Sequence, residues 1–371
     1  MDSLTQLALG AAVGEAVLGK KVGNKALVWG AVAGTVPDLD VVFSLFMDPV
    51  NYLSVHRGFS HSLFFPFIAA PLLAFVAHRV HRRTEQASRF DWTKLFFWGI
   101  ITHPLLDLMT GYGTQLFYPL TRHGYELNTI FVIDPAYTLP LLVGIIAAAF
   151  YKREAPRRRY WNWAGIGIAT AYLLLTVPLK LTAIPHFERA LEAQEIDYER
   201  MRTFPNPFTS FYWRALAETP DGNYVEAHYS HFWRDYEIRF TRIPGQHALL
   251  EESSVKRSYA GGELLWFSKG YYAVRETDDD RLLFHDLRFG ALEGWRGIYE
   301  DFTFSFLVYP HAPRNAAEEQ ERASAYVPGF EQMGLDADIT SDDIRAYFRS
   351  VFVQPPLQDG HETASGPERS P

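Results

Sequence analysis

Long apolar runs dominate the first half of this chain of 371 residues and restrict what it can fold into. A helix that crosses a membrane needs about 20 mostly apolar residues, and five segments meet that requirement. The first apolar segment of the chain, residues 4–19, is shorter and contains Glu15. A large soluble protein with buried helices is the alternative, but polar residues collected in the gaps between apolar runs are typical of membrane proteins. The five longer segments are residues 26–46, 62–80, 95–118, 129–150 and 161–184.

Lysine and arginine are unevenly distributed over the gaps between these segments. The first, third and fifth gaps hold three, five and five of them, whereas the second and fourth hold only Arg57 and Arg122. Because cytoplasmic loops carry an excess of Lys and Arg, the odd-numbered gaps are expected in the cytoplasm. The second and fourth gaps, and everything after residue 184, are then expected on the outer side.

The second half differs in both charge and pattern. Residues 1–183 carry 16 Lys and Arg against 11 Asp and Glu, whereas residues 184–371 carry 19 against 32. From residue 185 onward, short aromatic and β-branched runs alternate with turn residues, which predicts a soluble β-rich domain. Helical spacing predicts a connecting helix at residues 186–202 and a short amphipathic helix at residues 341–352. The expected strands are residues 211–218, 224–232, 236–242, 264–267, 271–276, 282–289 and 302–309.

The sequence therefore predicts a chain of three parts. Residues 1–184 are expected to form an α-helical membrane domain of about six helical segments. Residues 185–353 are expected to form a β-rich extracytoplasmic domain. Residues 354–371 are rich in Pro, Gly, Ser and charge, and such a composition favours a disordered tail.

Polar side chains inside the membrane half indicate where function is located. Charged groups at bilayer depth cost several kcal/mol and mark functional sites. Three clusters of such residues fall in the segment at residues 26–46, in the gap that follows it, and in the segment at residues 95–118. The distribution of Lys and Arg places all three clusters near the outer face. The clusters comprise Asp38 with Asp40, His56 with Arg57 and His61, and His103 with Asp107.

Three histidines and three aspartates supplied in pairs suit a divalent metal ion, because imidazole and carboxylate bind zinc, manganese and iron. The chain has no cysteine, so a thiolate zinc site and a cysteine nucleophile are excluded, and a catalytic site is favoured over a structural one. Other roles stay open. The histidines of the second gap would also suit the lipid interface, Asp38 and Asp40 a helix cap or a salt bridge to Arg57, and His103 with Asp107 a hydrogen-bonded pair.

Several stretches resemble the YdjM/YbcI family of inner-membrane, metal-dependent hydrolases. They run through the first ~140 residues, and the most specific is the His-Arg-Gly-x-Ser-His-Ser motif at residues 56–62. The His-x-x-x-Asp spacing of His103 and Asp107 is also similar to that of zinc-dependent phospholipases C and related nucleases. The other matching stretches are residues 1–6, 10–12, 34–40, 103–107 and 110–115, and two found in longer members, residues 134–135 and 206–214.

The resemblance implies a metal-dependent, phospholipase-like hydrolase in the cytoplasmic (inner) membrane of a bacterium. We expect a phosphoester or phospholipid substrate at the outer face, zinc as the metal, and no nucleic acid as partner. Asp40, Asp107 and Arg57 are the expected catalytic residues. A non-enzymatic metal-binding scaffold, or a transporter with a periplasmic recognition domain, is the alternative function. The expected metal ligands are Asp38, Asp40, His56, His61, His103 and Asp107.

Overall fold

The computed structural model describes residues 1–47, 49–83, 87–234, 236–277, 281–299, 302–308 and 341–355. These residues form two compact units. The first contains Met1–Leu45, Val55–Pro178 and Pro205–Ser210. The second contains Phe46–Ser54, Leu179–Phe204 and the described residues from Phe211 onward.

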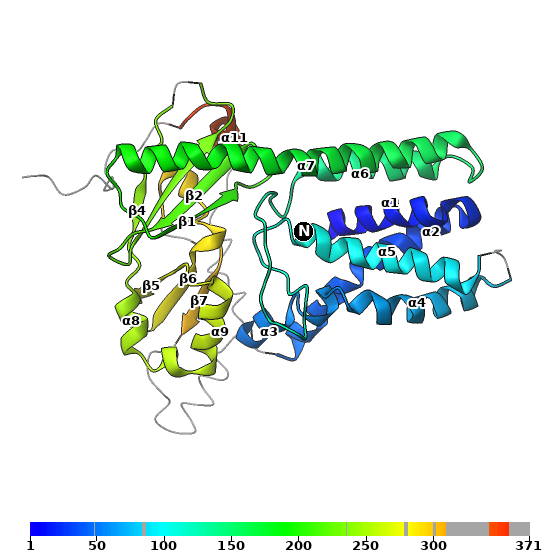
Figure 1. Ribbon diagram of the computed structural model, residues 1–371, viewed down its shortest axis with the longest axis horizontal. Helices are drawn as coiled ribbons and strands as arrows, with labels where there is room; N and C mark the ends of the chain where they lie inside the picture. The colour runs from blue at the N-terminus through cyan, green and yellow to red at the C-terminus, as the bar shows by residue number, and fades with distance from the viewer. Residues whose placement is uncertain are drawn as a thin grey trace, which may run out of the picture. The chain divides into compact units, whose positions relative to one another are not determined.

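The first unit is helical, and a helix lies at each of the six predicted segments (Figure 1). Short 3-10 helices and one short α-helix connect some of the long ones. The long helices are α1 (Ser3–Val22), α2 (Asn24–Thr35), α4 (Phe65–His81), α5 (Arg89–Asp107), α6 (Pro135–Ala149) and α7 (Pro156–Ala193). The connecting helices are η1 (Pro37–Leu45), η2 (Phe59–His61) and α3 (Pro49–Val55), and all of α3 except Val55 belongs to the second unit.

Helices α1 and α2 touch through their backbones, because glycines face each other where they cross. A Cβ atom on Gly10 would lie 2.4 Å from the carbonyl oxygen of Gly30, and one on Gly34 would lie 2.3 Å from that of Gln6. Small residues of this kind let membrane helices approach closely. The close approach places the end of α2 beside the start of α1, where the predicted site residues gather.

A buried ion pair also holds this unit together. The guanidinium of Arg158 on α7 donates two hydrogen bonds to the carboxylate of Glu15 on α1, at 2.6 and 2.5 Å. A third donor of Arg158 reaches the side-chain oxygen of Asn24 at 2.7 Å. Glu15 interrupts the first apolar segment for this structural reason.

Among the described residues, α7 is the helix that is long and apolar enough by itself to cross a membrane. Two bent pairs would raise the number to three if each is one span: α2 with η1, bent by 50°, and Val50–His61 with α4, bent by 68°. Six membrane-crossing helices are therefore not confirmed. The fourth predicted segment extends to residue 118, but α5 ends at Asp107 and residues 108–118 fold back as turns.

The second unit is rich in β-structure, as predicted, and holds two antiparallel sheets. The strand order is β1-β2-β3-β4 in one sheet and β5-β6-β7 in the other. The inner face of the first sheet packs on α7 through Phe187, Trp213 and Val225. The strands are β1 (Arg200–Pro205), β2 (Tyr212–Glu218), β3 (Tyr224–Ser230), β4 (Thr241–Ile243), β5 (Tyr272–Glu276), β6 (Leu282–Asp286) and β7 (Ser305–Val308). The helices are α8 (His247–Glu252), α9 (Tyr259–Ser268) and α11 (Ser341–Phe352).

Some local predictions in this half are wrong. Residues 264–267, predicted as a strand, belong to α9, because the Ser258 side chain caps that helix by accepting a hydrogen bond from Gly261 N at 3.1 Å. The predicted connecting helix at 186–202 ends at Ala193, and its last residues form β1. Of the predicted strand 236–242, only the last two residues are in β4.

A few predictions fall on residues that the structure does not describe. They are the end of the strand predicted at 302–309 and the part of the predicted tail from residue 356 onward. The predicted domain boundaries at residues 184 and 353 stay predictions.

Candidate metal centre

Three elements of the first unit carry the predicted site residues. Pro37 begins η1 after α2 ends, so the chain bends and presents Asp38 and Asp40 on a 3-10 turn. His61 is the last residue of η2. His103 and Asp107 lie one turn apart at the end of α5 and share a helical face.

Asp38, His61 and His103 meet in one group. The Nε2 atoms of His61 and His103 are 3.1 Å apart, and Asp38 Oδ1 lies 3.3 Å from each of them. Both imidazole rings are buried, whereas Asp38 is partly exposed. These three residues could hold a metal ion, because each offers a ligand atom and all three atoms lie within 4.8 Å of one another.

The hydrogen bonds of the two rings show which nitrogen faces the group. His103 Nδ1 lies 2.6 Å from the carbonyl oxygen of Gly34, which can only accept, so Nδ1 carries a proton. His61 Nδ1 lies 3.0 Å from Ser60 Oγ, whose own proton is donated to Asp40. In the neutral rings both Nε2 lone pairs therefore point at each other. A proton or a cation must lie between them, and metal-binding histidines are held in the same way.

Asp107 lies beside this group. Its Oδ2 atom lies 3.5 Å from the Nε2 atoms of both His61 and His103. This oxygen is buried and accepts no hydrogen bond from the described residues. A tetrahedral ion with bonds of about 2.0–2.1 Å has ligand atoms about 3.3–3.4 Å apart. The three distances within the group of Asp38, His61 and His103, 3.1 to 3.3 Å, are close to that spacing.

Asp40 and His56, also predicted as ligands, lie next to this group. Asp40 Oδ1 is 3.0 Å from His56 Nδ1, and Asp40 Oδ2 is 3.4 Å from His61 Nδ1. The carboxylate also accepts hydrogen bonds from Ser60 Oγ and from the backbone N–H of Arg57, at 3.0 and 3.2 Å. These contacts favour a role for Asp40 in orienting both histidines. Its metal-binding and catalytic roles stay predictions.

Arg57 brings a buried positive charge to the same place. Its backbone has a φ of 57°, a left-handed conformation that is uncommon outside glycine. Its guanidinium donates a 3.1 Å hydrogen bond to Thr110 Oγ1, and its Nε lies 3.4 Å from Asp107 Oδ2. The guanidinium also covers the Tyr112 ring, with 4.7 Å to the centroid. The loop that begins at Thr110 therefore positions Arg57.

The site residues lie in the part of the chain that is similar to a known protein family. The model of the YdjM inner membrane protein family matches residues 1–182. Residues 1–182 are therefore similar to this family, and we call them the YdjM region. The YdjM region contains every residue of the predicted site.

The chain is also similar to a single protein, "Uncharacterized protein YfhP" of Bacillus subtilis (strain 168). It is 25% identical over 234 residues, which is 61% of this chain and 67% of the relative. No solved structure matches the chain.

The structure adds residues to the site of the YdjM region that sequence reasoning missed. The buried Gln6 side chain donates to Asp107 Oδ1 at 3.0 Å, and the amino group of Met1 contacts the same oxygen. Gly34 holds His103 through its carbonyl oxygen. A buried polar residue on an apolar helix was the available signal for Gln6, whereas a backbone carbonyl leaves no signal in the sequence.

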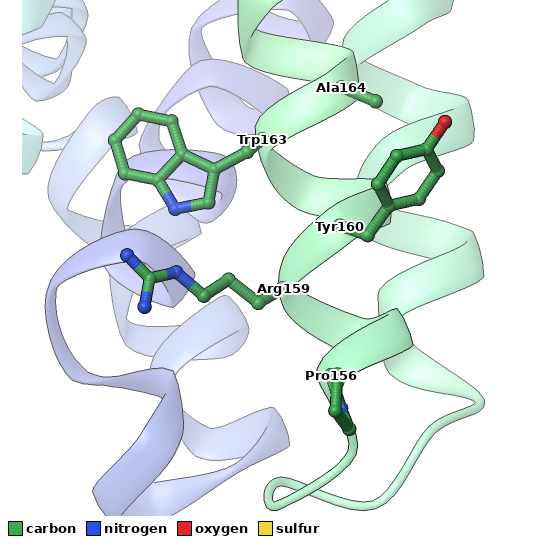
Figure 2. Close-up of a pocket in the computed structure, with 5 residues that line it drawn as sticks. All are labelled: Pro156, Arg159, Tyr160, Trp163 and Ala164. Carbon is green, nitrogen blue, oxygen red and sulfur yellow. The ribbon is translucent and has the colours of Figure 1, made fainter.

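A shallow hollow of about 600 Å³ lies elsewhere in the YdjM region. It is lined by the first turns of α7, where Arg159 and Trp163 point to one side and Tyr160 to the other (Figure 2). The neighbouring Arg158 pairs with Glu15, so the hollow is near the far end of α1 from Gln6. None of its lining residues belongs to the metal group.

Proposed function

We propose that the YdjM region is a metal-dependent hydrolase that cleaves a phosphoester, with a phospholipid as the favoured substrate. The observation that carries the proposal is the group of three ligand atoms from Asp38, His61 and His103, with the buried Oδ2 of Asp107 3.5 Å from both imidazole Nε2 atoms. Asp107 is the fourth ligand in this proposal. Zinc is the favoured ion, because imidazole and carboxylate ligands match its preference.

Charge supports both the ion and the substrate class. Three carboxylates lie in the cluster, against the guanidinium of Arg57 and the amino group of Met1. Negative charge is therefore in excess when the histidines are neutral, and buried uncompensated charge is costly. A divalent cation would offset this excess, and the cation together with Arg57 suits an anionic phosphoester.

Each side chain of the cluster has a separate role in the proposed reaction. A bound divalent ion supplies Lewis-acid chemistry, polarising the phosphoryl group and acidifying a water. Arg57 binds a phosphoryl oxygen, because a guanidinium matches phosphate geometry and Thr110 with Tyr112 holds it in place. Asp40 keeps the rings of His56 and His61 in their orientations. The partly exposed side of Asp38 marks where substrate enters.

The location of this activity follows from the distribution of basic residues. Because the second and fourth gaps hold only Arg57 and Arg122, we propose that the cluster opens toward the outer face of the cytoplasmic membrane. The helical region would then cross the bilayer several times, and the β-rich domain would be extracytoplasmic. Lipid headgroups would reach the cluster from the outer leaflet.

Asp107→Asn tests the hydrolase directly. The substitution keeps the size of the side chain but removes its charge from the ligand group. Changes next to metal ligands typically cost 10–100-fold in affinity or activity, so we expect hydrolysis to fall by about 100-fold or more. The measurement is turnover of phosphomonoesters, phosphodiesters and phospholipids in proteoliposomes, with zinc in excess.

Asp91→Asn is the matched control. Asp91 is on the same helix but caps its first turn and pairs with Lys21, outside the cluster. We expect this variant to keep the wild-type turnover. A metal-loaded wild type that exceeds Asp107→Asn on no substrate of the panel would contradict the hydrolase and favour a metal-binding scaffold or transporter.

A further inference from the structure

Helix α11 of the second unit carries one wide apolar face, and one edge of that face is buried in the unit. At this edge, Val351 is buried with Tyr212 and Trp233. Trp233 Nε1 donates a 2.9 Å hydrogen bond to the carbonyl oxygen of Ser350, and Ser230 Oγ donates a hydrogen bond to that of Val351. The helix is therefore fixed to the sheet, and its exposed apolar side chains cannot simply turn inward.

The outer face forms a ridge of exposed apolar side chains. Ile344, Phe348 and Phe352 are 49%, 45% and 59% exposed, and their spacing of four residues places them on one helical face. The Phe352 ring lies 5.0 Å from the ring of Phe232, which is also exposed. We define these four side chains as the α11 ridge. A contiguous apolar surface of this kind is typical of a protein or membrane interaction site.

The ridge lies at a specific level of helix α7. The carbonyl oxygen of Leu179 is 3.0 Å from His231 Nε2, and His231 directly precedes Phe232 of the ridge. From Leu179 onward α7 packs on the first sheet through Ala183 and Phe187. The part of the helix available to cross a bilayer is therefore residues 156–178.

The length of that part sets the membrane boundary. At 1.5 Å per residue, residues 156–178 extend about 34 Å, close to the ~30 Å hydrocarbon thickness of a bilayer. Leu179 then lies where α7 leaves the membrane. The hydrogen bond of His231 to Leu179 brings the ridge to the same boundary.

We propose that the α11 ridge inserts into the interfacial region of the bilayer that α7 crosses. The occupant of this surface is lipid, at the boundary between headgroups and acyl chains, where the apolar face of an amphipathic helix is stable. Arg345 and Arg349, both exposed, lie on the same helix and suit the headgroup layer. This inference does not depend on the metal centre.

The chain has no cysteine, so single cysteines can report the environment of each face of α11. Phe352→Cys and Phe348→Cys place a fluorescent bimane label on the ridge. Asp342→Cys, 84% exposed at its side chain, is the matched control on the same helix, because it lies neither three nor four residues from any ridge residue of α11. The full-length variants are reconstituted in liposomes with and without phosphatidylcholine brominated on its acyl chains, which quenches nearby fluorophores.

We expect brominated lipid to quench the labels at 348 and 352 at least about twofold more than the label at 342, as insertion of 5–10 Å requires. Aqueous iodide should show the reverse order. Equal quenching at all three positions by brominated lipid would overturn the proposal. Ridge labels that are shielded from iodide but not quenched by brominated lipid would also overturn it, and would point to a protein partner or a second copy.

Discussion

His103→Ala is expected to abolish stoichiometric metal binding by the purified protein. His103 Nε2 lies within 3.5 Å of every other atom of the ligand group that we propose, so its loss removes one ligand and exposes the rest to water. Because changes beside metal ligands already cost 10–100-fold in affinity, losing a ligand should cost about 100-fold or more. Metal content after gel filtration, measured by mass spectrometry, checks this.

His78→Ala is the control for that measurement. His78 is near the end of α4, about 20 Å along the helix from its first residue, Phe65, and α4 begins after His61. Its Nδ1 contacts the carbonyl oxygen of Ala87 at 3.3 Å. We expect His78→Ala to keep the wild-type metal content. Equal, trace metal in the wild type and in both variants would contradict the metal site.

Gly30→Ala is expected to have the largest effect on stability. The added Cβ would lie 2.3 Å from the carbonyl oxygen of Gly10 and 2.9 Å from the Cα of Gly14. These are backbone atoms, so α1 and α2 must separate along their whole contact to admit one methyl group. Overpacking typically costs 1–3 kcal/mol, and backbone collisions belong at or above the upper end, so we expect a loss of about 3 kcal/mol.

Gly167→Ala tests whether that loss is specific to the crossing point. Gly167 is also inside a helix, α7, but a Cβ there meets nothing within 4 Å. Alanine favours a helix over glycine by up to about 1 kcal/mol, so the melting temperature should stay constant or rise. The check is loss of the monodisperse peak after heating in detergent. Equal melting temperatures for Gly30→Ala and the wild type would refute the backbone contact.

The helices of the first half could largely be predicted, because long apolar runs indicate them in the sequence. A helix lies at each predicted segment, and the three polar clusters were expected to converge from spacing and charge. The end of α5 was not predicted, because residues 108–118 carry no charge although the chain turns there. Whether each helix crosses the bilayer could not be predicted from periodicity, since charges near their ends, such as Glu15 and Lys94, shorten the apolar windows of α1 and α5.

The separate roles of the site residues could not be predicted from the sequence either. The pairs Asp38 with Asp40 and His56 with His61 have equivalent donors, so their spacing predicts ligands for all four. Only side-chain directions separate them: Asp38 Oδ1 faces His61 Nε2 at 3.3 Å, whereas Asp40 Oδ2 faces His61 Nδ1 at 3.4 Å. In the second half, short apolar runs such as residues 264–267 suit a strand or a helix equally, and the Ser258 cap decides for a helix.

The central claim is that His61, His103 and two aspartates hold one divalent ion. X-ray absorption at the metal edge of the purified protein tests it most directly. We predict four nitrogen or oxygen neighbours at about 2.0–2.1 Å, with the scattering pattern of two imidazoles. In His61→Ala reloaded with metal, the imidazole contribution should fall by half. A wild type without stoichiometric metal, or a spectrum that stays unchanged in His61→Ala, would contradict the account.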